Sequence, residues 1–411
     1  MSDRPATKTF SAETLKRPEI REDPYPLYRE LWETGRAIPT EIGGLALTHH
    51  ADVIAALRHP KLSSSNEHEP GNEEFRKAAI EVGFGDLIEQ SDHTLLFLDP
   101  PDHTRLRKLV AQTFTPRTIG AMRPRIRVLV DELLDVALAR PDGFDLVDDL
   151  AYLLPVTVIS EMLGVPLADQ AQLRAWTAVA TRALDPNSGF EGMEGVPDAL
   201  RGLRTYFDGL IATRRSDPDD DLLSALVSVE TEGERLTHDE LRATIVLLYG
   251  AGHETTVNLI GNGIVALLRH PDQWRRLCDD PSLAPGAVEE ALRYDSPVQL
   301  TGRLAVETVD LDGIHVDALQ NTLLLLGAAN RDPDVFADPD RFDITRVPND
   351  QTAFGGGIHF CLGAALARVE GQEAFTALAQ RAPALGLASD TLPRKETVTL
   401  RGFASVPVRA G

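Results

Sequence analysis

The chain has few cysteines and no long apolar run. Its 411 residues include two cysteines, Cys278 and Cys361, so a disulfide framework is excluded and a reducing compartment is expected. No run of about 18 consecutive apolar residues occurs, and the stretch 1–24 is polar and charged. We therefore expect neither a membrane anchor nor a signal peptide, and we predict a soluble, cytoplasmic protein.

Positive charge is also scarce. The net charge of −22 argues against nucleic-acid binding, because a phosphate backbone would be repelled. Residues 103–127 are an exception, with several basic side chains and no acidic one. These basic residues fit two interpretations: solvated helix faces, or a docking surface for an acidic partner with Arg107 turned inward.

Length and patterning indicate one large domain over residues 1–411, because no linker, repeat or low-complexity tract marks a boundary. Helical periodicity dominates, which predicts a mainly α fold with small β-sheets (α+β). Helices are expected over 23–35, 52–58 and much of 126–228, and short strands around 45–47 and 307–326. Residues 61–93 are polar and lack a sustained period, so we predict a long, mobile loop there.

The stretch 354–370 carries the strongest chemical signal. Three consecutive glycines, Gly355 to Gly357, allow positive φ and a close approach of the backbone to a flat cofactor. Cys361 follows, and then an alanine-rich helical pattern whose first N–H groups would point back at the sulfur. Such a helix start lowers a cysteine pKa and favours a thiolate ligand. The alternative for a lone cysteine is a small buried hydrophobe.

A long helix is expected over residues 237–270. It begins with a Thr237–Glu240 capping box, ends before Pro271 and would span roughly 50 Å. Its middle, Gly250 to Thr256, is a poor helical sequence, so we expect a local kink with a threonine hydroxyl bonded to the preceding turn. This middle is either a small-residue packing notch or, since an acid precedes an alcohol, a proton relay.

Both stretches resemble motifs of the cytochrome P450 family. The pattern Phe-Gly-x-Gly-x-His-x-Cys-x-Gly resembles its haem-binding signature, and Ala-Gly-x-Glu-Thr resembles its oxygen-activation motif. The resemblance implies haem b between the central helix and the cysteine loop, with Cys361 as the iron ligand. It also implies that Thr255 steadies bound dioxygen and that Glu254 connects it to solvent protons. The implied haem contacts are Cys361, His103, Arg107, Arg303, His359, Phe354, Gly355 and Gly363, with His103, Arg107 and Arg303 assigned to the propionates.

A second set of residues would support the cysteine loop. Glu290 and Arg293 resemble the family's Glu-x-x-Arg element, which Arg341 of the Pro-x-Arg-Phe segment would complete. The chain departs from the family at Gln351–Thr352, where a histidine-led segment is frequent, and at 316–320, where a proline-glycine turn is expected. Neither departure involves the iron ligand.

The resemblance also implies a substrate pocket. Its lid would be formed by residues 61–95 and 166–205, the latter interrupted by a glycine- and proline-rich break at 184–197. An apolar pocket with few polar anchors is expected. The candidate substrate contacts are Leu247, Leu248, Ala251, Val298, Gln299, Leu300, Phe403 and Ala404.

The implied function is a monomeric haem-thiolate monooxygenase. It would insert one atom of O2 into an apolar secondary metabolite, steroid, terpenoid or aromatic compound by hydroxylation, epoxidation or O-dealkylation. Electrons would come from NAD(P)H through a reductase and an acidic ferredoxin that docks near Arg105, Lys108, Arg117 and Arg123. Two alternatives remain: a peroxide-driven or rearranging haem-thiolate enzyme, and a haem sensor or ligand carrier without turnover.

Overall fold

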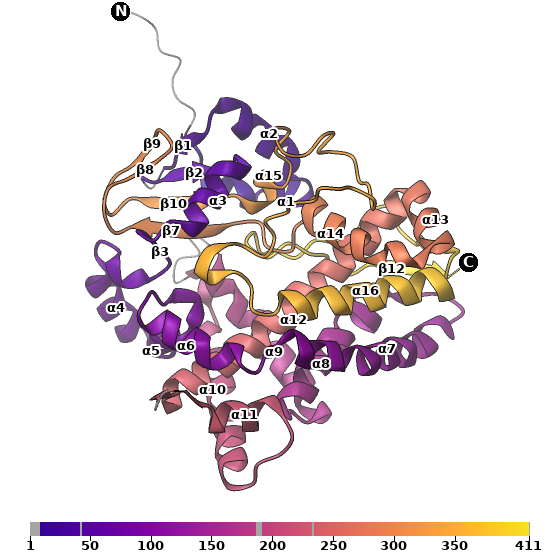
Figure 1. Cartoon of the computed structure of the whole chain (residues 1–411), viewed down its shortest axis with the longest axis horizontal. Coiled ribbons are helices and arrows are strands. Elements are labelled where there is room, and N and C mark those ends of the chain that lie inside the picture. Colours follow the sequence, from indigo (N-terminus) through magenta and orange to yellow (C-terminus); the bar gives the residue numbers. More distant parts are fainter. Residues whose placement is uncertain (1–8, 42, 186–190, 232–233, 411) are drawn as a thin grey trace, which may run out of the picture.

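The computed structural model describes residues 9–41, 43–185, 191–231 and 234–410 (Figure 1). Most of the described chain is helical, and the small sheets lie mainly to one side of the helices (Figure 1). The α-helices are α1 (Pro18–Glu22), α2 (Tyr25–Thr34), α3 (His50–Arg58), α4 (Asn72–Glu81), α5 (Gly85–His93), α6 (Asp102–Ala111), α7 (Pro116–Leu138), α8 (Leu153–Leu163), α9 (Gln170–Ala180), α10 (Val196–Ser216), α11 (Leu222–Ser228), α12 (His238–Arg269), α13 (Pro271–Asp279), α14 (Ala284–Tyr294), α15 (Leu326–Ala329) and α16 (Ala364–Arg381).

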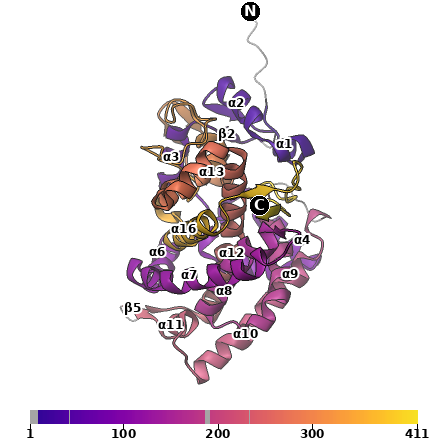
Figure 2. The same ribbon diagram turned by 90° about the vertical axis from the view of Figure 1, so that its right-hand side faces the viewer.

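Helix α12 is the centre of the helical part (Figure 2). It starts at the predicted capping box, in which Thr237 and Glu240 satisfy each other's backbone N–H groups. It packs against α8, α10, α14 and α16, and its apolar residues are distributed around the whole helix, as expected for a helix that is buried over most of its length. Gly263 allows α16 to come close, because a Cβ there would lie 2.4 Å from the Phe375 ring.

The largest sheet has five strands in the order β1-β2-β10-β7-β3, and α3 and α15 lie beside it (Figure 1). The predicted hairpin forms as β8 and β9, and Asp312 (φ 50°) and Gly313 (φ 89°) make the turn. The strands are β1 (Ala37–Pro39), β2 (Leu45–Leu47), β3 (Leu62–Ser63), β4 (Phe144–Asp145), β5 (Glu230–Thr231), β6 (Glu234–Arg235), β7 (Thr301–Ala305), β8 (Val309–Leu311), β9 (Ile314–Val316), β10 (Asn321–Leu324), β11 (Leu385–Leu387) and β12 (Pro407–Ala410).

One prediction of local structure was wrong. Residues 61–93 do not form a loop, because the segment contains β3, α4 and α5. Helix α4 is rich in Glu, Lys and Ala, which favour helix despite a weak apolar pattern, and α5 packs against α10 and α12. In the predicted break at 184–197, residues 186–190 lie outside the described part of the chain.

The unusual segment 316–320 closes on the sheet. Leu319 has φ 64°, and its N–H donates to the carbonyl oxygen of Ala305 at 2.7 Å. Within the described ranges, no helix has both the length and the apolar character that crossing a bilayer requires.

Candidate active site

The cysteine loop is held against α3 by its glycines. Gly355 and Gly357 have φ values of 69° and 65°, which favour glycine. A Cβ at Gly357 would lie 2.3 Å from the Leu57 carbonyl oxygen, so a larger residue would displace the loop. The Cys361 N–H donates to the Phe354 carbonyl oxygen at 3.0 Å, which closes the loop just before α16.

The electrostatics at Cys361 differ in part from the prediction. Burial raises the pKa of the thiol, whereas the N–H groups of Gly363 and Ala364 and the guanidiniums of Arg107 and Arg368 lower it. The N–H groups at the start of α16 therefore act as expected, but burial is the larger effect and the pKa lies above its ordinary value. A metal ion deprotonates a thiol that coordinates it. Although surrounding atoms raise its pKa, Cys361 reaches the protein surface and is accessible to such a ligand.

Four basic side chains converge beside this loop. His103 of α6 lies against His359, with ring centroids 4.3 Å apart. Burial, together with the neighbouring His103, Arg303 and Arg107, lowers the pKa of His359 to about 3. Arg107 also donates to the carbonyl oxygen of Phe360, so it helps to hold the cysteine loop.

Among the described residues, Asp99 is the carboxylate that acts on both His103 and Arg303 of this basic cluster. Both ring nitrogens of His103 are buried and have no hydrogen-bond partner within the described chain. Arg303 is 6% exposed and donates to the carbonyl oxygen of Gly302 (2.6 Å) and to Thr301. Burial lowers the pKa of Arg303, and the carboxylate of Asp99 acts to raise it. Unpaired buried donors are costly, so the cluster fits an anionic group with two carboxylates, such as the haem propionates.

The middle of α12 presents an uncovered face. Ala251 is exposed and Leu247, Leu248 and Thr255 are partly exposed, although His253 on the other side is buried. Residues 247, 251 and 255 are four apart and share one face. The Thr255 hydroxyl donates to the Ala251 carbonyl oxygen at 2.9 Å, which is the predicted bond to the preceding turn. The helix continues through 250–256, and the kink stays a prediction.

Glu254 has a partner that the sequence did not suggest. It forms an ion pair with Lys395 from the C-terminal segment. Burial acts to raise the pKa of Glu254, but Lys395 and His253 lower it more, so the pKa lies below its ordinary value. His253 is buried and hydrogen-bonded to the Tyr249 carbonyl oxygen at 2.6 Å, in keeping with the structural role predicted for it.

The remaining pocket candidates divide into two groups. Val298 is partly exposed and forms an isolated bridge with Leu400, and Ala404 is exposed. Gln299, Leu300 and Phe403 are at most 4% exposed. The Gln299 side chain hydrogen-bonds Tyr28 and the Ser296 carbonyl oxygen, and the Arg394 guanidinium lies 3.6 Å from the Phe403 ring centroid. Protein atoms surround these three side chains, which argues against substrate contact.

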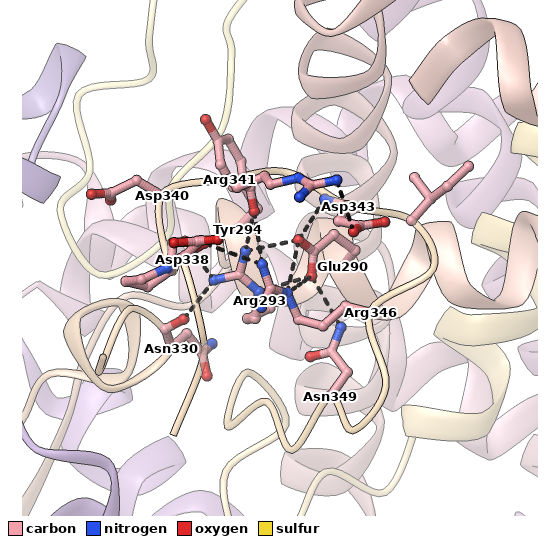
Figure 3. Close-up of polar contacts among 12 residues, drawn as sticks. Glu290, Arg293, Tyr294, Asn330, Asp338, Asp340, Arg341, Asp343, Arg346 and Asn349 are labelled. Atoms are coloured by element: carbon pink, nitrogen blue, oxygen red, sulfur yellow. Dashed lines mark hydrogen bonds and ion pairs between the residues drawn. The ribbon is translucent and has the colours of Figure 1, made fainter. Parts of the chain in front are cut away.

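The Glu290 cluster forms, with one correction (Figure 3). Glu290 and Arg293 are completely buried and form two hydrogen bonds of 2.8 Å. The third charge is Arg346, whose Nε lies 3.2 Å from Glu290 Oε2. Arg341 was predicted for this place, but its side chain is 61% exposed and lies 3.4 Å from Asp343. Arg341 contributes its backbone carbonyl oxygen, which accepts from Arg293 at 3.1 Å.

The unusual residues before Phe354 also brace the loop. Gln351 donates to Glu289 at 3.0 Å, and Glu289 accepts from Arg368 at 2.6 Å. The Arg368 guanidinium lies 4.4 Å from the Phe354 ring centroid. Thr352 N–H donates to Asn330 Oδ1 at 2.7 Å. These contacts are between segments far apart in the sequence, so composition offered no signal for them.

The predicted docking surface is partly neutralised. Arg105 pairs with Glu240, and Arg123 pairs with Glu373. Lys108 and Arg117 are exposed. The basic character of this face is therefore lower than the sequence alone indicates.

Comparisons with known proteins agree with this geometry. A family model described as Cytochrome P450 matches residues 195–280 and 282–381. The chain is 44% identical to Cytochrome P450 107B1 of Saccharopolyspora erythraea, over 89% of each chain. It is 43% identical to Vitamin D(3) 25-hydroxylase of Pseudonocardia autotrophica, over 89% of this chain and 87% of that protein.

A solved structure also superimposes over nearly the whole chain. This is P450BioI in complex with an acyl carrier protein ligated to hexadec-9Z-enoic acid, with a TM-score of 0.88, 36% identity and coverage of 95% of this chain and 98% of that one. The site residues, the fold and these similarities lead to one conclusion. The chain belongs to the cytochrome P450 family and is a haem-dependent monooxygenase.

Proposed function

We propose that the enzyme inserts one atom of O2 into a bulky, apolar secondary metabolite or a steroid- or terpenoid-like compound, by hydroxylation, epoxidation or O-dealkylation; a smaller aromatic is the second candidate. The observation that carries this proposal is the uncovered face of α12, where Leu247, Leu248 and Ala251 precede the Glu254–Thr255 pair. Apolar walls with few polar anchors suit an apolar substrate. Vitamin D(3) 25-hydroxylase, named for a large substrate, supports this size class.

Each part of the site has a separate task in this proposal. Haem, when bound, supplies the oxygen chemistry, including O–O cleavage favoured by a thiolate ligand. Cys361 would hold the iron, and Gly355, Phe354 and Gly363 shape the loop that carries it. His103, Arg303 and His359 would bind the propionates by charge-assisted hydrogen bonds. Arg107 would divide its donors between the propionates and the Phe360 carbonyl oxygen.

Thr255 and Glu254 would transfer protons from solvent to the reaction site. The Thr255 hydroxyl lies on the uncovered face and can accept a hydrogen bond there while its proton is donated to the Ala251 carbonyl oxygen. The Glu254 carboxylate is next to it in sequence and connects it to solvent. A positioned acid–base group of this kind typically contributes ~100-fold or more to rate.

The electron route and the setting of the enzyme complete the proposal. Electrons from NAD(P)H would arrive through a reductase and an acidic ferredoxin, which docks near Arg105, Lys108, Arg117 and Arg123. We place the monomeric enzyme in the cytoplasm, where two free cysteines suit a reducing environment. A single domain over residues 1–411 is part of the proposal, and one hydrophobic core cluster with members from Leu95 to Val408 supports it for that part of the chain.

Peroxide-driven chemistry is the second candidate for this site. It would need no delivery of protons to bound dioxygen, so the intact Glu254–Thr255 pair counts against it. A carrier or sensor without turnover would use neither residue and would consume no NAD(P)H.

The test compares two neighbouring threonines. T255A removes the hydroxyl on the uncovered face, and T256A removes a buried hydroxyl that bonds to the Gly252 carbonyl oxygen at 3.3 Å. In T255A we expect haem spectra to be unchanged while the hydrogen peroxide formed per NAD(P)H rises strongly. T256A should stay close to the wild type. Equal coupling in both variants would overturn the proton role of Thr255.

A further inference from the structure

Within the described chain, Glu254 forms its ion pair with Lys395. The two residues are 141 positions apart, and their side chains are 22% (Lys395) and 15% (Glu254) exposed. The backbone places Lys395 firmly, because its N–H donates to the Gly402 carbonyl oxygen at 3.0 Å. Gly402 itself lies against α12, since a Cβ there would be 2.0 Å from Asn258 Oδ1. The C-terminal segment 395–402 is therefore held against α12, the helix that carries Glu254 and Thr255.

A small pocket is lined in part by Lys395. Its volume is about 20 Å³, which is enough for one water molecule. Its lining includes Lys395, Arg21, Arg394 and Gly402, together with apolar side chains of the N-terminal region. The Nε atoms of Arg21 and Arg394 are buried and have no hydrogen-bond partner among the described residues. A water in this pocket would find several polar partners, as a stable buried water requires.

We propose that Lys395 is a positioning residue for the monooxygenase reaction: its ammonium group holds the Glu254 carboxylate in a fixed, partly solvent-accessible position, next in sequence to Thr255. The inference rests on the proposed role of Glu254. An ammonium group has three donors, so one can bind Glu254 while the others bind water. The carboxylate then stays beside Lys395, next in sequence to Thr255. Protons come from the water, because an ammonium is too weak an acid to supply a carboxylate.

The charges around Glu254 support a dominant role for Lys395. Burial has the largest effect on the pKa of Glu254 and acts to raise it. Lys395 has the next largest effect and lowers the pKa, followed by His253 and Arg174. Tyr152 also faces this region, and Glu254 acts to raise its pKa. His253 has a lowered pKa from burial and is neutral near pH 7, and Arg174 lies over the Tyr152 ring at 3.8 Å. Without Lys395, burial would dominate and Glu254 would take up a proton at higher pH.

The experiment uses the holoenzyme of K395M, K395R and K61M. Lys61 is a control because it also forms an ion pair, with Glu307, but both side chains are exposed and belong to other elements. Two quantities are measured: product formed per NAD(P)H with a turned-over substrate, and the infrared carbonyl band of protonated carboxyl groups in the resting protein at pH 7. The double variant K395M/E254Q assigns any new band to Glu254.

We expect K395M to lower product per NAD(P)H about tenfold, less than the loss of the acid–base group itself, because Glu254 remains. K395M should also show a new carboxyl band that K395M/E254Q lacks, whereas K395R and K61M resemble the wild type. If K395M forms as much product per NAD(P)H as the wild type, the proposal is overturned, whether or not the new carboxyl band appears. An equal loss in K395R and K395M overturns it as well, because the effect would then be steric. If E254Q and T255A are both fully coupled, the proposed function of the relay fails, and the band still reports whether the ion pair exists.

Discussion

Replacing Arg346 by methionine should weaken the structure that carries Cys361, whereas the same change at Arg341 should not. Arg346 is 11% exposed and shares the carboxylate of Glu290, which is fully buried. Its guanidinium also donates to the carbonyl oxygens of Ala337, Asp338 and Arg341 at 2.7–3.2 Å. R346M removes all of these donors at once.

The magnitude follows from burial. Removing one partner of a buried ion pair costs about 3–5 kcal/mol, and the lower end applies because Glu290 keeps Arg293. The entropy of unfolding is about 2.1 cal/mol/K per residue, so 411 residues give about 0.9 kcal/mol/K. A loss of about 3 kcal/mol then lowers the melting temperature by ~3–4 °C. The exposed Arg341 pair should contribute about 0–1 kcal/mol, so R341M should melt within about 1 °C of the wild type.

Calorimetry and the rate of haem loss measure this difference. R346M should melt earlier and release haem faster than R341M. Equal stability of the two variants, or a larger loss in R341M, would refute the assignment of Arg346 as the third charge of the cluster.

Two further changes test local features. G357A should destabilise the cysteine loop by about 1–2 kcal/mol or more, because φ is 65° and the new Cβ would meet the Leu57 carbonyl oxygen. The control G209A adds its Cβ in open space on α10 and should not destabilise the protein. Equal melting temperatures of the two variants would contradict the strain argument. Asp295 is buried between Arg394 and Arg401, which hold its pKa below the ordinary value against the effect of burial. A lowered pKa adds stability above about pH 4 that is lost as the pH falls further, so D295N should have a lower urea midpoint at pH 7 and a flatter pH dependence below about pH 4. Parallel pH profiles of D295N and the wild type would contradict this reasoning.

Local signals predicted the parts of the fold that depend on neighbouring residues. The capping box at Thr237 and the proline at 271 bounded the central helix to within one residue at each end. The turn at Asp312–Gly313 formed as expected, because its conformation depends on the two residues themselves. The threonine bond to the preceding turn of α12 is likewise a local contact.

Contacts between distant segments could not be predicted in this way. Arg341 and Arg346 lie in one irregular stretch, where no periodicity shows which side chain turns inward. Lys395 reaches Glu254 across 141 positions, and nothing in its own neighbourhood signals that pairing. The loop prediction for 61–93 failed because helix propensity and packing on α10 outweigh a weak apolar pattern.

The most direct test of the account is the absorption difference spectrum of the purified, reduced protein with and without carbon monoxide. Thiolate ligation by Cys361 predicts a strongly red-shifted Soret band, and C361A should lose it. A protein that binds haem but shows an unshifted band, or one that binds no haem, would contradict the central claim that Cys361 is the iron ligand of this monooxygenase.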